Sequence, residues 1–136
     1  MRFDTKIAVA LRDDLPVWQK LNVVAFTVSG LGATQPDLIG ETYADASGNL
    51  YLPMFRQPVL VFAGSADALK AAHARALARN LRIAIYTADL FATNHDEANR
   101  AAVKAVPADA LDLVGFALHA DRKDADRVLK GLALHP

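Results

Sequence analysis

The chain contains no cysteine, and this absence removes several kinds of site at once. Disulfide bonds, thiolate nucleophiles and zinc sites built on thiolates all require that residue. Histidine remains as a nitrogen ligand, but no two of the four histidines stand four residues apart, as a metal-binding pair on one helix would. We therefore expect no metal. No glycine-rich phosphate loop follows a strand either, and we expect no cofactor.

The chain also has no excess of positive or negative charge. Lys plus Arg and Asp plus Glu each number 15, so the formal net charge is zero. Non-specific binding of nucleic acid is mostly neutralisation of phosphate, so the charge gives no support for tRNA as a partner. No apolar run approaches the roughly 18 residues of a membrane span. Residues Met1–Lys6 hold no apolar signal core, and we expect a cytoplasmic protein that does not enter membranes.

What the chain does have is enough apolar residues for one core. Its 136 residues are 53% hydrophobic and 22% charged, which is typical of a globular domain and excludes disorder. No repeat, low-complexity tract or linker divides it. We predict a single domain over residues 1–136.

The apolar runs alternate in length along the chain. Four short runs predict buried strands, and four longer stretches between or after them predict helices. The predicted strands are 6–11, 59–63, 81–87 and 111–118, and the predicted helices are 16–30, 65–80, 94–106 and 121–132. Turn residues between two aromatic runs in 40–54 predict a β-hairpin. The fold class is therefore α/β, a three-layer α/β/α arrangement with a mostly parallel (mixed) central sheet of about four strands plus the small hairpin.

Three local predictions can be compared directly with a structure. Ser65 is placed to cap the helix that follows it, and Asp13 or Asp14 to cap the first helix. Thr93 or Asn94 begins the third helix, and Glu97, three residues after Asn94, resembles a capping box. The first helix carries an apolar stripe of Val17, Leu21, Val24 and Val28, widened by Trp18, so little of it should meet water.

Ligands of open α/β sheets bind beyond the carboxyl ends of the parallel strands. The residues at those ends are Arg12, Asp13, Asp14, Ser65, Asp89, Thr93, Asn94, His95 and His119. If the strands are parallel, these side chains meet at one edge of the sheet. A strand that runs the other way takes its residues out of the set.

Several of these residues also resemble a known family. The stretch Lys6–Leu15 with Lys20, and the motif Asp89-Leu-Phe-Ala-Thr93, are similar to the two motifs of type II peptidyl-tRNA hydrolases. The segments 12–22, 93–99 and 111–118 more closely resemble an uncharacterised branch of that superfamily, a domain family of unknown function. The resemblance implies a peptidyl-tRNA hydrolase II-like fold.

The same resemblance implies roles for single residues. Lys20, Asp89 and Thr93 would be catalytic: Lys20 would stabilise the developing oxyanion and Asp89 would orient or deprotonate a water. The substrate, a small molecule or a peptidyl ester, would be bound by Arg12, Asp14, Asn22, Asn94 and His95. Each residue also has a plainer interpretation: an exposed lysine, a carboxylate bound to nearby backbone, helix caps, and an arginine paired with an acid.

Two functions follow from these patterns. The first is a cofactor-independent hydrolase of an ester or amide, related in fold to the peptidyl-tRNA hydrolases. The alternative is a non-catalytic module that binds a small molecule or a protein, and it is favoured by residues that depart from the family pattern. Trp18 and Gln19 stand where the family has glycine, and Phe91 replaces the glycine of the second motif. A homodimer is expected for the binding module.

Overall fold

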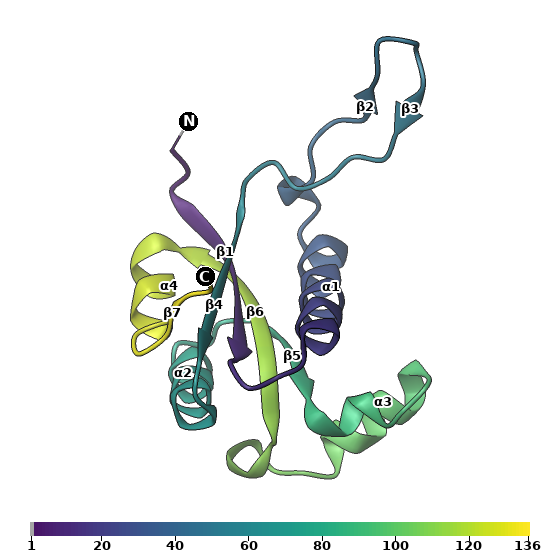
Figure 1. The fold of residues 1–136 in the computed structure, drawn as a ribbon. Helices are drawn as coiled ribbons and strands as arrows, with labels where there is room; N and C mark the ends of the chain where they lie inside the picture. The colour runs from purple at the N-terminus through teal and green to yellow at the C-terminus, as the bar shows by residue number, and fades with distance from the viewer. Residues whose placement is uncertain (1) are drawn as a thin grey trace.

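The computed structural model describes residues 2–136, and these form two sheets and four α-helices (Figure 1). The strands are β1 (Thr5–Arg12), β2 (Tyr43–Ala44), β3 (Leu50–Tyr51), β4 (Val59–Gly64), β5 (Ala84–Thr87), β6 (Leu113–Asp121) and β7 (Ala133–Leu134). The α-helices are α1 (Val17–Thr34), α2 (Ala66–Ala78), α3 (Asp96–Lys104) and α4 (Arg122–Val128). Three short 3-10 helices are η1 (Pro36–Leu38), η2 (Ala88–Phe91) and η3 (Ala108–Ala110). None of the helices in residues 2–136 is long and apolar enough to cross a membrane.

The central sheet is mostly antiparallel, so the prediction of a mostly parallel sheet was wrong. Its five strands lie in the order β5-β6-β1-β4-β7. Only β1 and β4 pair in parallel, whereas β6 runs against both β1 and β5, and β7 runs against β4. Strands β1, β4 and β5 therefore share one direction, and their carboxyl ends still lie at one edge of the sheet.

The direction of β6 follows from the position of α3. The periodicity of 94–106 suggested a helix that crosses the sheet, but no residue of α3 is buried. It packs beside η2 at the edge where β5 ends, and the chain then turns back into β6 without crossing a face. A hydrogen bond of 2.9 Å from the Ala88 amide to the Asp112 carbonyl joins the end of β5 to the start of β6. A return at the same edge makes the two strands antiparallel.

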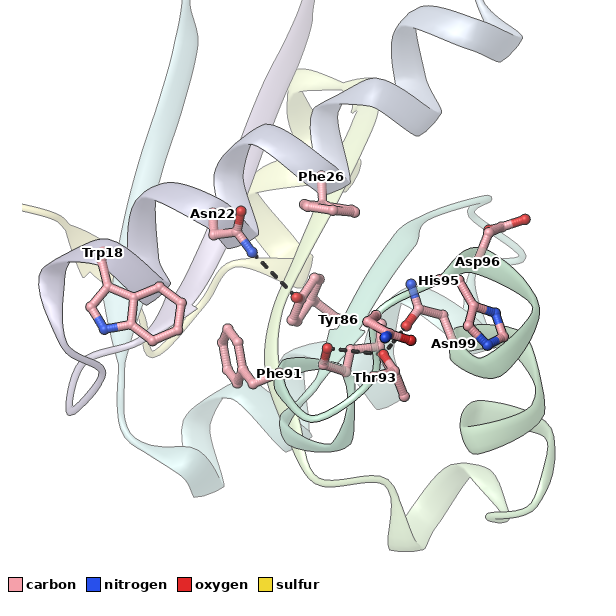
Figure 2. Close-up of a pocket in the computed structure, with 11 residues that line it drawn as sticks. Trp18, Asn22, Phe26, Tyr86, Phe91, Thr93, His95, Asp96 and Asn99 are labelled. Carbon is pink, nitrogen blue, oxygen red and sulfur yellow. Dashed lines mark hydrogen bonds between the residues drawn. The ribbon is translucent and has the colours of Figure 1, made fainter.

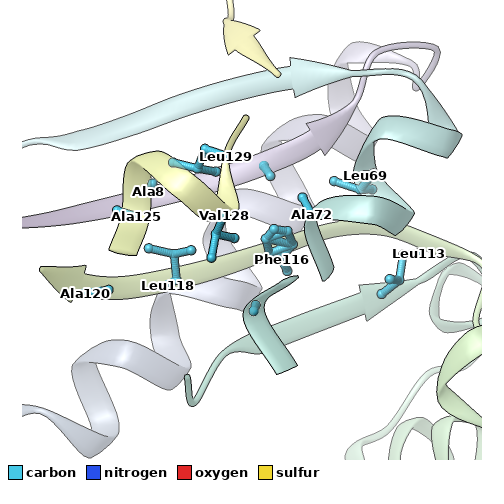
Figure 3. Packing of buried hydrophobic residues seen from close by; sticks show 12 residues of the cluster. Ala8, Leu69, Ala72, Leu113, Phe116, Leu118, Ala120, Ala125, Val128 and Leu129 are labelled. Carbon is cyan, nitrogen blue, oxygen red and sulfur yellow. The ribbon is translucent and has the colours of Figure 1, made fainter. Parts of the chain in front are cut away.

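Helices cover both faces of the sheet, as the three-layer prediction requires. On β1, Ile7, Val9 and Leu11 contribute to the core beneath α1, while Ala8 and Ala10 contribute to the core beneath α2 and α4. This alternation is the period of two of a strand buried on both faces. Figure 3 shows the second core, where Phe116 of β6 lies among side chains of α2 and α4.

The predicted stripe of helix α1 was right in part, because Val24 and Val28 pack against the core but the fully buried row is a different one. Val23, Thr27 and Leu31, four residues apart, face the sheet. Val17 is 72% exposed and Leu21 is 65% exposed. The apolar stripe of the sequence was therefore too wide to identify the buried face, because apolar residues occur around most of this helix.

The predicted cap of α2 was right, whereas the predicted cap of α1 and the predicted end of the last helix were wrong. Ser65 caps α2, since its hydroxyl accepts a hydrogen bond of 3.1 Å from the Ala68 amide. Helix α1 has no side-chain cap, so Asp13 and Asp14 do not have the predicted role. The chain after α4 turns at Gly131, whose φ of 89° is favourable only for glycine, and forms β7 where helix was predicted.

The predicted hairpin is present and extends away from the rest of the molecule (Figure 1). Tyr43 pairs with Tyr51 and Ala44 with Leu50, while every residue from 41 to 54 is exposed. At its base, Gly40 donates a backbone hydrogen bond of 2.8 Å to the Met54 carbonyl. The hairpin is thus a defined arm joined to the body just beyond the C-terminal end of α1.

Candidate functional site

A pocket of about 420 Å³ lies between α1 and the segment formed by η2 and the start of α3 (Figure 2). Helix α1 contributes three residues spaced by four, so their side chains share one face of the helix. The lining residues are Trp18, Asn22, Phe26, Tyr86, Leu90, Phe91, Thr93, Asn94, His95, Asp96 and Asn99. The pocket therefore stands at the carboxyl end of β5, at the edge selected by the strand-end rule.

Four aromatic rings form a continuous wall along this pocket. Trp18 and Phe91 meet edge to face with ring centres 5.8 Å apart, and Phe91 and Tyr86 are 5.0 Å apart. Phe26 meets Tyr86 edge to face at 5.7 Å. These spacings are those of favourable aromatic pairs, which contribute roughly 0.5–1.5 kcal/mol each. The wall is held by its own contacts and does not need a ligand to assemble it.

The innermost polar group of the wall is the Tyr86 hydroxyl. Tyr86 is 4% exposed, and its hydroxyl oxygen accepts a hydrogen bond of 3.4 Å from the Asn22 side-chain amide. Burial raises the pKa of Tyr86 above its ordinary value, although the Asn22 hydrogen bond acts in the opposite direction. The phenol therefore stays protonated at neutral pH and keeps a hydrogen to donate.

The opposite side of the pocket is built from a loop fixed by its own hydrogen bonds. The Thr93 hydroxyl lies 3.0 Å from the Leu90 carbonyl and also contacts the Asn99 side-chain oxygen. His95 is the N-cap of α3, because its Nδ1 accepts a hydrogen bond of 3.2 Å from the Ala98 amide. That contact leaves His95 Nε2 to carry the proton of a neutral ring.

Four of the eight predicted site residues meet in this pocket, namely Asn22, Thr93, Asn94 and His95. Two of them serve local structure in other ways than predicted. The α3 cap is His95, where Thr93 or Asn94 was expected, and the capping box with Glu97 is absent from the contacts of α3. Thr93 instead ties η2 to α3, and Asn94 is exposed at the pocket.

The other four predicted residues lie outside the pocket lining. Lys20 Nζ is 3.1 Å from His135 Nε2 near the C-terminus of the chain, and Asp89 is exposed in η2. Arg12 donates to Asp14 at 2.6 Å and to Asp112 at 3.1 Å. The hydrogen bond that Arg12 donates to Asp14 is the main cause that raises the pKa of Arg12. Arg12 and Asp14 thus bind each other, the plainer of the two interpretations of that arginine.

His119 belongs to the other end of the sheet. Because β6 is antiparallel to β1, its last residues lie opposite the edge that holds the pocket, and His119 leaves the predicted set. Its Nδ1 is 2.5 Å from the Gln35 side-chain oxygen, while its Nε2 is buried without a partner. Burial lowers the pKa of His119, against the opposing charge of Asp121.

The aromatic wall was missed by sequence reasoning. Trp18 was assigned to the apolar side of its helix, and Phe26, Tyr86 and Phe91 were not considered as ligand contacts. One signal was available: Trp18, Asn22 and Phe26 are spaced by four, an aromatic-amide-aromatic row on one helix face. Nothing local in the sequence identifies Tyr86 as its neighbour, because that contact spans 64 residues.

The lining of the pocket combines aromatic and polar side chains. It includes three asparagines, one histidine and one carboxylate, Asp96, which pairs with Arg100, but neither lysine nor arginine. No group of three or more His, Asp or Glu residues within 2–136 is arranged to hold a metal ion. Planar rings can stack on the aromatic wall, and amide groups can donate to and accept from a ring edge.

Fold and pocket together define a class, a small mixed α/β protein with a ligand-sized aromatic pocket at one sheet edge. Within that class, the model of the family described as "Protein of unknown function (DUF2000)" matches residues 5–136. The chain belongs to this family, which agrees with the predicted likeness to a domain family of unknown function.

A solved structure has nearly the same fold as this chain. It is the structure of the protein of unknown function Atu0240 from Agrobacterium tumefaciens strain C58. The two sequences are 49% identical, and the TM-score is 0.97 over 99% of this chain and 100% of that one. No curated protein matches. The relation to peptidyl-tRNA hydrolases stays a prediction from the two motifs.

Proposed function

We propose that the protein is a non-catalytic binding module for a small, uncharged, planar heteroaromatic molecule, of which a nucleoside base is the model. The observation that carries the proposal is the four-ring wall with amide groups at its edge in one pocket. A volume of about 420 Å³ suits a molecule of that size.

The polar groups determine what kind of ring is suitable. Asn22 donates one amide hydrogen to Tyr86, and its side-chain oxygen remains available to a ligand. Asn99 accepts from Thr93 through its side-chain oxygen, and its amide hydrogens remain available. Together with the Tyr86 hydroxyl, these groups offer both donors and acceptors. A ring with alternating donors and acceptors at its edge is complementary to them. The lining has no Lys or Arg, so a phosphate would find no counter-charge there.

The hydrolase remains the second proposal from the motifs, with Lys20 and Asp89 in its catalytic roles. Lys20 contacts His135 and Asp89 is exposed outside the pocket lining, so the pair is not built around the pocket. Release of peptide from a model peptidyl-tRNA, lost in Asp89→Ala, would favour the hydrolase over the binding module.

The test of binding uses Trp18, the one tryptophan of the chain. Because Trp18 belongs to the wall, stacking of a ligand should quench its fluorescence directly. Titration with adenosine and with uridine should give saturable quenching by at least one of them. The Asn22→Ala and Asn99→Ala variants should weaken binding roughly 10-fold each, the usual cost of losing one hydrogen bond.

Asn49→Ala is the matched control, since Asn49 lies in the exposed hairpin and not in the pocket. It should bind like the unmodified chain. Quenching that is linear and unsaturable for every nucleoside, or equally strong in Asn22→Ala and Asn99→Ala, would refute the proposed recognition.

A further inference from the structure

Exposed apolar side chains gather on two neighbouring elements of the molecule. Within residues 2–136, eleven large hydrophobic residues are substantially exposed, and nine of them belong to α1 or to the hairpin arm, defined as residues 41–54. Leu52 is 84% exposed and Leu50 is 75% exposed. Large apolar side chains exposed in such number on two elements indicate a site of association.

The outward face of α1 also lacks charge. Its exposed residues are Val17, Trp18, Leu21, Ala25, Phe26, Ser29, Ala33 and Thr34. Lys20, the single charged residue of this 18-residue helix, is instead paired near His135. A surface helix normally carries charged residues opposite its buried stripe. Their absence indicates that the part of this face outside the ligand pocket, away from Trp18 and Phe26, packs against something apolar.

The hairpin arm is ordered although no part of it is buried. Asp45 holds its tip, accepting hydrogen bonds from the Ser47 amide at 2.9 Å and the Tyr51 hydroxyl at 2.6 Å. An isolated two-stranded hairpin is only marginally stable in water. The arm carries Glu41 and Asp45 and no basic residue, so an anionic membrane or nucleic acid is a poor partner for it.

We propose that a second copy of this chain covers these two elements, with the α1 helices packed antiparallel across a twofold axis near Ala25. Ala25, Ser29 and Ala33 are small and four residues apart, so two helix backbones can approach closely along this row. The arm leaves the body at the C-terminal end of α1 (Figure 1). An antiparallel pairing therefore brings each arm to the N-terminal half of the partner's α1, where Val17 and Leu21 are exposed.

The size and symmetry of the surface fit this partner. Seven large apolar residues outside the ligand pocket contribute, namely Val17, Leu21, Tyr43, Leu50, Tyr51, Leu52 and Met54. Each removes on the order of 100 Å² from water, and the pair together about 1,400 Å². That lies within the roughly 1,200–2,000 Å² of a stable interface. In a twofold pair, an arm–helix contact occurs twice, so one chain supplies both of the surfaces required.

The first experiment measures the mass of the purified full chain by sedimentation over a range of concentrations. The unmodified chain should be a dimer at micromolar concentration. Leu52→Arg in the arm and Ala25→Arg at the helix crossing should each weaken the dimer at least about 30-fold, as loss of a central contact does. Leu77→Arg on α2 is the matched control and should leave the dimer intact, since Leu77 lies on the other side of the sheet. All three sites are exposed, so the melting temperature of the monomeric unit should be preserved.

The second experiment fixes the geometry and uses the absence of cysteine. Ala25→Cys should form a disulfide-linked dimer on mild oxidation, and a mixture of Val17→Cys and Leu52→Cys chains should form a mixed dimer. Ala78→Cys, exposed on α2, should remain monomeric on the gel. A chain that stays monomeric up to about 0.5 mM, far above the Kd of a standard interface, would overturn the proposal. A dimer that Leu77→Arg disrupts as strongly as Leu52→Arg would overturn it as well.

Discussion

Gly115 of β6 sets how closely α1 packs on the sheet, and replacing it with alanine should show this. A Cβ atom at that position would stand 2.5 Å from Val23 Cγ1 of α1 and 2.9 Å from the Ala10 carbonyl oxygen of β1. Relief of the first contact requires α1 to move, and relief of the second requires the paired strands β1 and β6 to shift. Overpacking of this kind costs about 2 kcal/mol of unfolding free energy. For a chain of this length we expect the melting temperature to fall by roughly 6–10 °C.

Gly32→Ala gives the matched control with the opposite sign. Gly32 lies within α1, and a Cβ there would meet only Ile39 Cδ1, at an ordinary contact distance of 3.8 Å. Alanine in a helix interior is more favourable than glycine by about 0.5–1 kcal/mol, so this variant should melt at a higher temperature. Differential scanning calorimetry of both variants measures the two shifts.

A double-mutant cycle identifies the contact responsible. Val23→Ala removes the Cγ1 atom that an alanine at position 115 would meet. The double variant should therefore lose about 1 kcal/mol less unfolding free energy than the sum of the two single losses. Since Val23 follows Asn22 on α1, Gly115→Ala should also weaken ligand quenching of Trp18. Full stability of Gly115→Ala, or strict additivity in the cycle, would refute the reasoning.

Three further predictions concern single polar groups. The Thr87 hydroxyl is buried without a partner, so Thr87→Val should raise the free energy of unfolding, measured in denaturant melts, by about 1 kcal/mol. Thr27→Val should not raise it, because the Thr27 hydroxyl donates a hydrogen bond of 2.7 Å to the Val23 carbonyl. Hydrogen bonds, first from Tyr51, lower the pKa of Asp45 to about 2, and NMR titration should show it rise in Tyr51→Phe. Burial lowers the pKa of His73 in the folded chain, so below about pH 6.5 the unfolded chain binds more protons than the folded chain does. The melting temperature should therefore fall between about pH 7 and pH 5, and it should fall less in His73→Gln.

The elements were predictable from local patterns, and their directions were not. Runs such as Val59–Ala63 and the Ser65 cap depend on neighbouring residues, and the structure has both. The direction of β6 depends on whether α3 crosses the sheet. That helix has a strong apolar-polar periodicity yet buries no residue, so its pattern resembles that of a crossover helix. The pattern shows that a helix is amphipathic without showing what lies against it.

The candidate site was half predictable for a similar reason. Asn22, Thr93, Asn94 and His95 were selected by strand ends and by motif likeness, and they share the pocket. Lys20 was selected by the same likeness, but its position around the helix directs it toward His135. Trp18 and Asn22, on the pocket side of α1, are each two residues, about half a turn, away from Lys20. Residues two apart lie on nearly opposite sides of a helix, and likeness to a short motif does not show which side a residue is on.

The two outermost strands of the central sheet have a consequence for solubility at high concentration. Strand β7 is two residues long, and β5 is four residues long with an irregular register between Tyr86 and Thr87. A long, flat outer strand is a template on which further chains can add and grow into fibrils. Within residues 2–136, neither outer strand of this sheet is such a template. The long strands β1, β4 and β6 are paired on both sides and cannot take up a further strand. Edge-to-edge association of sheets from different molecules should therefore require the fold to open first.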